Sequence, residues 1–281
     1  MNFSQAAIFA ALVTNLLLPS SGRADVLITD VIGKPGLVGK PPLAILNEIT
    51  NGSLIEVPAG FQFTAIDLVT GKEYLASGPG QFRIASSGVI SMTTGSVKMR
   101  SVADVPLPDV KIATGKISRA SMTMRGGAAM LAKLPMYPSD TAVPDTTPTL
   151  RWEHIAGSSR YRVTVSDDTK VIWQSITTEA QLALTPETGL LEGKRYTWKI
   201  VPLSLTDTPV AEAASARFSV VAADAARVLA LIKPTPDASF SAWSLYAAQL
   251  QEAGANDDAK TIWQALSRER PNDPNLQKLT K

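Results

Sequence analysis

The residues most often used in catalysis occur here without the neighbours that catalysis requires. His154 is the only histidine of the chain, and it follows Trp152 in a stretch of alternating apolar and polar residues. A histidine that acts as general acid or base normally needs an orienting carboxylate, and the sequence places none beside it. The nearby Gly157-Ser158-Ser159 lacks the Gly-x-Ser-x-Gly spacing of a nucleophile elbow and is typical of a turn. We therefore expect His154 to be a surface residue.

Two carboxylate pairs are close enough in sequence to be weighed for glycoside cleavage, which uses paired acids. Asp67 and Glu73 flank one turn, and Asp167 and Asp168 share another. We expect the first pair to face solvent on paired strands and the second to cap its turn. Neither pair predicts a hydrolase, so we assign no catalytic residue and predict that the chain is not an enzyme.

Metal and cofactor sites are not predicted either. The chain has no cysteine, which excludes disulfides, thiolate ligands and a cysteine nucleophile. The run from Gly254 to Asp258 is too short for a calcium loop, and we expect Asn256 or Asp257 to cap a helix instead. Methionine thioethers can bind Cu(I), but methionine also fills gaps in cores, and we favour that interpretation for the cluster of Met122, Met124, Met130 and Met136.

Basic and aromatic residues are interleaved at Arg160-Tyr161-Arg162 and at Lys194-Arg195-Tyr196, as they are in grooves that bind single-stranded nucleic acid. The same alternation is typical of a strand whose aromatic side chains are buried and whose arginines are wet. The formal charge is only +2, from 27 basic and 25 acidic residues, so strong electrostatic steering is not expected. We predict no nucleic-acid partner.

The N-terminal segment has the pattern of a secretory signal peptide. An apolar run at residues 6–18 is followed by Pro19-Ser20-Ser21, and Gly22-Arg23-Ala24 places small residues at the −3 and −1 positions of a cleavage after Ala24. No Lys or Arg precedes the run, and the alternative is a buried or loosely attached N-terminal helix. The run is shorter than the ~20 residues of a membrane-spanning helix. We predict a signal peptide at 1–24, a periplasmic or secreted product, and no integral membrane span after cleavage.

Residues 25–104 predict a first β module. Phe61-Gln62-Phe63-Thr64-Ala65 alternates between apolar and polar residues, and the alternation shifts by one position at 66–69, as at a β-bulge. Turn signals recur about every eight to twelve residues, which is typical of a sandwich or small barrel. The order of motifs at 43–46, 51–54, 57–60, 70–74 and 78–80 resembles a FecR-like β domain of exported bacterial proteins. That resemblance implies a periplasmic module for protein interaction or signal relay.

Residues 148–221 predict a second β module after a proline-rich connector at 105–147, which includes a further candidate strand at 116–125. Pro148-x-Leu150-x-Trp152, the strand at 161–165, Leu190-x-x-Gly193 and Tyr196-x-Trp198 resemble a fibronectin type III-like or immunoglobulin-like sandwich. The resemblance implies that Trp152 lies in the core and that Tyr196 takes the position of the tyrosine corner.

The period changes to that of helices in residues 222–281. Helices are predicted to end near Ile232, to span 239–253, and to run from Asn256 or Asp257 to Arg268. The last two resemble a single tetratricopeptide-type hairpin, which cannot bury its own apolar face and must dock on the β modules or on a partner. Trp243, Tyr246 and Trp263 form the candidate partner surface, and core packing is the alternative that we favour for them.

Together these patterns predict a mainly β chain of two β modules, FecR-like and fibronectin type III-like, with a small C-terminal helical hairpin. The predicted function is an exported, non-catalytic scaffold or adaptor of the bacterial cell envelope. A protein of the envelope is the expected partner, and a cell-wall polymer is a second candidate. The alternative function is a periplasmic signalling or envelope-stress component that acts through the FecR-like part. No cofactor is expected.

Overall fold

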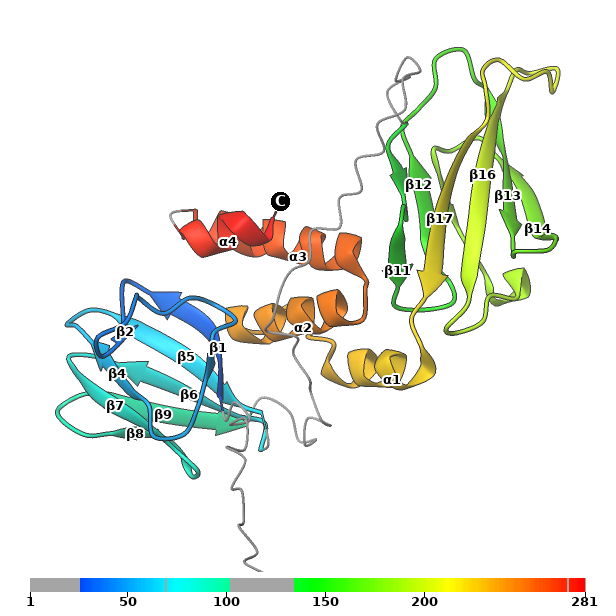
Figure 1. Cartoon of the computed structure of the whole chain (residues 1–281). Coiled ribbons are helices and arrows are strands. Elements are labelled where there is room, and N and C mark those ends of the chain that lie inside the picture. Colours follow the sequence, from blue (N-terminus) through cyan, green and yellow to red (C-terminus); the bar gives the residue numbers. More distant parts are fainter. Residues whose placement is uncertain (1–25, 69, 102–133, 272, 281) are drawn as a thin grey trace, which may run out of the picture.

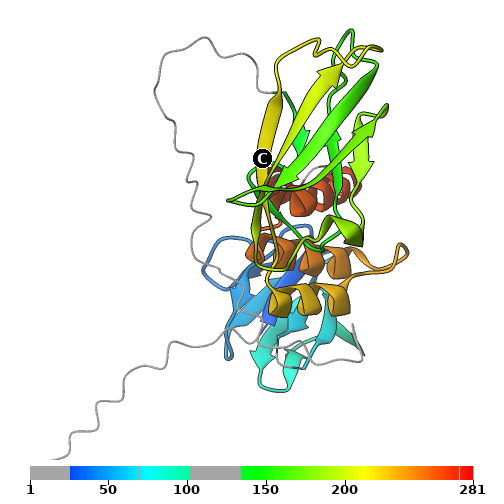
Figure 2. The same cartoon turned by 90° about the vertical axis from the view of Figure 1, so that its right-hand side faces the viewer.

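The computed structural model describes residues 26–68, 70–101, 134–271 and 273–280. Within these residues the chain is mainly β, with four helices at the C-terminal end, so the predicted fold class is confirmed. Figures 1 and 2 show the helices between two β modules that contact them from opposite sides. The predicted signal peptide at 1–24 and the candidate strand at 116–125 lie outside the described residues.

The first β module consists of two antiparallel sheets that face each other. One sheet has five strands in the order β3-β1-β5-β6-β9, and the other has four in the order β2-β4-β7-β8. Phe63 and Phe82 meet edge to face between the sheets, with ring centroids 5.9 Å apart. The strands are β1 (Val26–Ile32), β2 (Gly36–Leu37), β3 (Glu48–Ile49), β4 (Leu54–Val57), β5 (Gln62–Asp67), β6 (Lys72–Ser77), β7 (Gly80–Ala85), β8 (Gly88–Ser91) and β9 (Ser96–Ser101).

Strands β1 and β5 are buried on both faces. Phe63 and Ala65 lie in the core between the sheets, whereas Leu27 and Ile66 form a separate cluster with Leu245 on the opposite face. The shift predicted at 66–69 is therefore wrong: the alternation continues through β5, and its second face is also covered. The irregularity of register lies on β1 instead, between Ile28 and Asp30.

The second β module is also a two-sheet sandwich, and it begins earlier than predicted. Its sheets have the orders β10-β12-β15 and β11-β17-β16-β13-β14. The first two strands, β10 and β11, lie within the span that we assigned to the connector. They belong to the module because β10 pairs with β12 and β11 runs parallel to β17. The strands are β10 (Met136–Tyr137), β11 (Thr141–Val143), β12 (Thr149–Trp152), β13 (Arg160–Ser166), β14 (Val171–Thr177), β15 (Gln181–Ala183), β16 (Arg195–Leu203) and β17 (Ala214–Val220).

Aromatic residues fill the core of the second module. Trp198 is fully buried between the sheets, and Trp152 packs against it and against Tyr161. The Tyr196 hydroxyl accepts a hydrogen bond of 2.8 Å from the Leu191 backbone N–H, five residues upstream. That bond ties the loop before β16 to the buried tyrosine.

The four helices are α1 (Ala223–Ile232), α2 (Phe240–Glu252), α3 (Asn256–Glu269) and α4 (Pro274–Leu279). Ser239 caps α2, since its side chain accepts a hydrogen bond from the Ala242 backbone N–H at 3.2 Å. The predicted cap of α3 is wrong: Ala255 occupies the N-cap position without a side-chain bond. The hydroxyl of Thr141 in β11 accepts from the Asp257 N–H instead, at 3.4 Å. An orphan donor of α3 is thus satisfied by the second β module.

The helices dock on both β modules at once. On one side Ser241 and Leu245 of α2 contact β1 and β5, and Arg270 forms an ion pair with Asp30 at 3.3 Å. On the other side the Ala142 N–H of β11 donates to the carbonyl of Gly254 at 2.9 Å. The apolar face of the hairpin is therefore covered within the chain, as expected for a unit too small to be stable alone.

Candidate functional site

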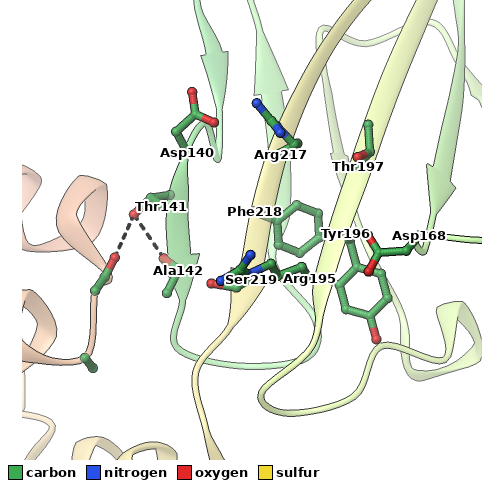
Figure 3. Close-up of a pocket in the computed structure, with 12 residues that line it drawn as sticks. Asp140, Thr141, Ala142, Asp168, Arg195, Tyr196, Thr197, Arg217, Phe218 and Ser219 are labelled. Carbon is green, nitrogen blue, oxygen red and sulfur yellow. Dashed lines mark hydrogen bonds between the residues drawn. The ribbon is translucent and has the colours of Figure 1, made fainter. Parts of the chain in front are cut away.

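A cleft of about 480 Å³ lies where the second β module meets the connection between α2 and α3. Figure 3 shows its lining, which comes from β11, from the neighbouring strands β16 and β17, and from the turn that carries Asp168. The helical side is formed by Ala253 and Gly254. Five segments that are separate in the sequence therefore build this site together.

Backbone hydrogen bonds hold the two walls of the cleft together. Gly254 ends α2 with a positive φ of 80°, the left-handed conformation that glycine adopts most readily. Its carbonyl accepts from the Ala142 N–H at 2.9 Å and from the Thr141 hydroxyl at 3.2 Å. The contact of β11 with the helical turn thus depends mainly on main-chain groups.

Two arginines and two carboxylates give the cleft its chemistry. Arg195 and Arg217 are exposed on neighbouring strands, and Asp140 and Asp168 lie on either side of them. Asp140 adopts a φ of 54°, and its N–H donates to the Arg217 carbonyl at 2.7 Å. A guanidinium donates up to five hydrogen bonds and suits phosphate or carboxylate, whereas an aspartate accepts hydrogen bonds from hydroxyl groups.

Hydroxyl groups complete the lining of the cleft. Thr197 and Ser219 add hydroxyl groups beside the arginines. None of the residues that line the cleft is a histidine, cysteine or lysine, so Ser219 has no base of those types within the lining to activate it. The cleft therefore offers donors and acceptors that could orient a polar anion.

Beside the cleft, the N-terminus of α3 docks on the second module through two aspartates. The Tyr137 hydroxyl donates to Asp258 at 2.7 Å, and the Ser139 N–H donates to Asp257 at 3.5 Å. Burial raises the pKa of both carboxyl groups, and in Asp258 the bond from Tyr137 opposes that rise. Burial, together with the charge of Asp258, also raises the pKa of Tyr137. Negative charge is favourable at a helix N-terminus, and here it also fixes the helix to the sheet.

His154 lies away from this cleft. It is exposed, and its Nδ1 is 2.9 Å from the hydroxyl of the buried Tyr161. The same hydroxyl accepts from the Ile155 N–H at 3.0 Å and from the Ser158 hydroxyl at 2.7 Å. The histidine thus belongs to a small network that orders the turn before β13, and its predicted surface position is confirmed.

The carboxylate pairs differ from each other in outcome. Asp67 and Glu73 are 7% and 2% exposed, so the prediction that they face solvent is wrong. Glu73 forms an ion pair with Arg100 of the neighbouring strand β9, and Asp67 accepts from the Thr70 N–H at 2.9 Å. Asp167 caps its turn as predicted. Hydrogen bonds from Thr169 and Lys170 to its carboxylate lower its pKa.

The residues of the candidate partner surface are mainly packed inside. Trp263 is fully buried, and its indole N–H donates to Gln251 at 3.0 Å. Tyr246 is 7% exposed. Trp243 is half-buried and contacts the Tyr246 ring edge to face at 6.1 Å. Of the three, Trp243 alone retains a surface that a partner could reach.

Three of the four clustered methionines, Met122, Met124 and Met130, lie outside the described residues, and Met136 packs against the core of the second module. Among the described residues, no three His, Cys, Asp or Glu side chains are grouped as metal ligands would be. None of the helices in the described ranges is long and apolar enough to cross a membrane.

The cleft was not predicted from the sequence, because Asp140 and Thr141 lie in the span assigned to the connector. The β-branched and small residues of Thr141-Ala142-Val143, directly after Asp140, were the available signal for an edge strand. The sequence predicted only that Arg195 and Arg217 occupy solvent-exposed positions of strands with alternating apolar and polar residues. Their proximity depends on the pairing of β16 with β17, which no local pattern reveals.

Comparisons with known proteins add no relative to this description. No model of a known protein family matches the chain. A search of curated proteins also finds no match.

Proposed function

We propose that the chain is an exported, non-catalytic scaffold or adaptor of a bacterial cell envelope, which holds two β modules in a fixed arrangement for binding. The observation that carries the proposal is the double docking of the helices. Arg270 and Ser241 contact the first module while Gly254 and Asp258 contact the second. A unit that is bonded on both sides positions its neighbours relative to one another, which is the task of a scaffold.

The domain names remain part of this proposal. A FecR-like first module is supported by two antiparallel sheets built from short strands and tight turns at 26–101. A fibronectin type III-like second module is supported by its strand order and by the bond between Tyr196 and Leu191. A tetratricopeptide-like hairpin is supported by the buried packing of α2 and α3 around Ala247, Ala259 and Trp263. Export rests on the signal-peptide pattern of residues 1–24.

The free edge of the second module is the surface that best fits a protein partner. Strand β14 ends its sheet and pairs with β13 on one side. Its sequence, Val-Ile-Trp-Gln-Ser-Ile-Thr, carries no charge, and Val171 and Ile176 are 57% and 49% exposed. An exposed, uncharged edge can accept an extended segment of another protein through main-chain hydrogen bonds.

The test compares capture of a partner by the wild type with capture by a variant whose β14 edge is blocked. The protein lacking residues 1–24 is immobilised, exposed to a cross-linked extract of the cell envelope, and compared with an Ile176→Lys variant. We expect at least one protein to be retained by the wild type and lost from Ile176→Lys, because a lysine opposes pairing at an edge.

The matched control is Leu205→Lys, which places the same charge at a loop position that is 78% exposed. This control should retain the captured protein, and urea unfolding should show that both variants are as stable as the wild type. Equal loss in both variants, or cleavage of cell-wall material by the purified protein, would contradict the proposal.

A further inference from the structure

The outward face of the five-stranded sheet carries a diagonal row of basic side chains, here called the basic row. Pairing in the sheet places Arg217 opposite Thr197, Lys199 opposite Thr164, and Arg162 opposite Val201. From Arg195 to Arg162, each cation is thus one strand over and two residues along from the one before it, and Arg160 follows Arg162 two residues along the same strand, β13. The members of the basic row are Arg195, Arg217, Lys199, Arg162 and Arg160.

The spacing of the basic row follows from strand geometry. Alternate residues on a strand are about 6.7 Å apart, and neighbouring strands are about 4.8 Å apart. Successive cations on different strands are therefore about 8 Å apart, and Arg162 and Arg160, on the same strand, are about 7 Å apart. The row begins at the cleft, where Arg195 and Arg217 form part of the lining, and it crosses the sheet to β13.

Most of these cations have no acidic partner within the described part of the chain. Arg160 pairs with Asp207 at 3.3 Å, whereas Arg162, Arg195, Lys199 and Arg217 form no ion pair there. Arg195, Lys199 and Arg217 are exposed. Four like charges on one face repel one another, and an anionic ligand would relieve that repulsion.

The neighbours of the basic row indicate which anion fits. Thr164, Thr197 and Ser215 lie between the cations and offer hydroxyl groups. At the cleft, Asp140 and Asp168 stand beside the arginines. These carboxylates repel phosphate and peptide carboxylate alike, but they accept hydrogen bonds from the hydroxyl groups of a sugar or polyol, which an acidic peptide such as polyglutamate lacks.

The aromatic residues of these strands argue against a single-stranded nucleic acid. Such grooves use aromatic rings as platforms on which bases stack. Tyr161, Tyr196, Trp198 and Phe218 are all buried on the inner face of the sheet. The outward face thus combines cations and hydroxyl groups without exposed rings from these strands.

We propose that the basic row binds an extended sugar-phosphate or polyol-phosphate polymer, one repeat of which occupies the cleft. Arginine side chains contact the phosphates, and Asp140 and Asp168 accept hydrogen bonds from hydroxyl groups of the repeat in the cleft. The inference rests on the proposed scaffold function, because it names a cell-wall type of ligand for the same module. It uses a different surface from the β14 edge.

The test measures binding of fluorescein-labelled poly(glycerol phosphate) to the protein lacking residues 1–24, by fluorescence anisotropy at several salt concentrations. We expect the Lys199→Gln/Arg217→Gln variant to bind about tenfold or more weakly, because two charged hydrogen-bonding groups are lost. The dependence of affinity on salt should also become shallower, since fewer counterions are released. We also expect the protein to leave the polymer unshortened during the measurement.

The matched control is Arg227→Gln/Lys233→Gln, which removes the same charge from exposed positions on α1 and just after it. It should bind within about twofold of the wild type. Equal weakening by this control would overturn the inference, because net charge alone would then explain binding. Equally tight binding of poly-L-glutamate or of a thymidine oligonucleotide would overturn the assigned chemistry, as would no binding of the polymer at physiological salt.

The outcomes separate the two proposals. Failure of the polymer to bind, with protein capture still lost in Ile176→Lys, removes the inference and leaves the scaffold. Binding that depends on Lys199 and Arg217, with shortening of the polymer over time, supports the site and removes the non-catalytic function.

Discussion

The helical unit contacts its two β neighbours by different means. Against the first module, α2 covers the second face of β1 and β5 with an apolar cluster of Leu27, Ile66, Leu68 and Leu245. Against the second module, Ala142 and Val221 pack with the helices, and hydrogen bonds join Gly254, Asp257 and Asp258 to residues 137–142. The first interface carries an apolar cluster of its own, and the second has fewer apolar residues and more hydrogen bonds.

This difference indicates which interface contributes more to stability and which one fixes the orientation of the second β module. Apolar burial is worth about 25 cal/mol per Å² and is not directional. Hydrogen bonds contribute about 1 kcal/mol net but require fixed geometry. The polar groups of the first interface illustrate the cost of burial, since burial raises the pKa of Asp30 although Arg270 opposes the rise. We expect the first interface to dominate stability and the second to fix the orientation of the sandwich.

The largest expected effect comes from the apolar interface. Leu245→Ala should lower the free energy of unfolding by about 2–5 kcal/mol, because it leaves a cavity between α2 and the first sheet. Urea unfolding measures the loss, and hydrogen exchange should increase in β1 and β5 more than in β16. The control Leu231→Ala changes a side chain that is 58% exposed and should cost about 0.5 kcal/mol or less. Similar losses in both variants would contradict the assignment of Leu245 to a core.

A smaller effect is expected at the polar interface. Tyr137→Phe removes the hydroxyl that donates to Asp258 and should cost about 1–3 kcal/mol, since it leaves a partly buried carboxylate without this donor. Asp258→Asn keeps an acceptor for that hydroxyl and should cost less. Unfolding in urea compares the two variants, and small-angle scattering should show a changed arrangement of the modules for Tyr137→Phe. An unchanged scattering profile would contradict the orienting role.

The smallest effect is a pH dependence of the polar interface. The folded-state pKa values of Asp257 and Asp258 lie above the ordinary value of 3.8. At a pH between the ordinary value and the raised values, the folded chain therefore binds more protons than the unfolded chain does. The stability that these groups contribute therefore increases as pH falls through that window and is lost as pH rises.

The measurement compares the wild type with Asp257→Asn/Asp258→Asn in urea between about pH 7 and about pH 4. As the pH falls, the unfolding free energy of the wild type should increase relative to that of the variant. The surrounding charges are Arg151 and Lys260, which are cationic, and Asp140 and Asp145, which are acidic. Parallel profiles for the two proteins would contradict the burial of these carboxylates.

Local patterns predicted the fold class and most elements well. The alternation at 160–166 and 195–203 predicted β13 and β16, because each of these strands has one buried face and one wet face. The period at 240–252 predicted α2, and the glycine at position 254 predicted its end. The candidate site was predicted much less well, because its residues come from five segments that only strand pairing and the docking of the helices bring together.

Propensity and periodicity act over a few neighbouring residues, and they were enough to predict most strands and helices, although not β10 and β11. Three features follow from the tertiary fold alone. Strands β1 and β5 are buried on both faces, and Asp67 and Glu73 are buried. The hydroxyl of Thr141 accepts a hydrogen bond from the Asp257 N–H at the start of α3. The physical reason is the same in each case. Burial and hydrogen-bond partners are set by the surface that arrives from elsewhere in the chain, and a local pattern carries no information about which surface that is.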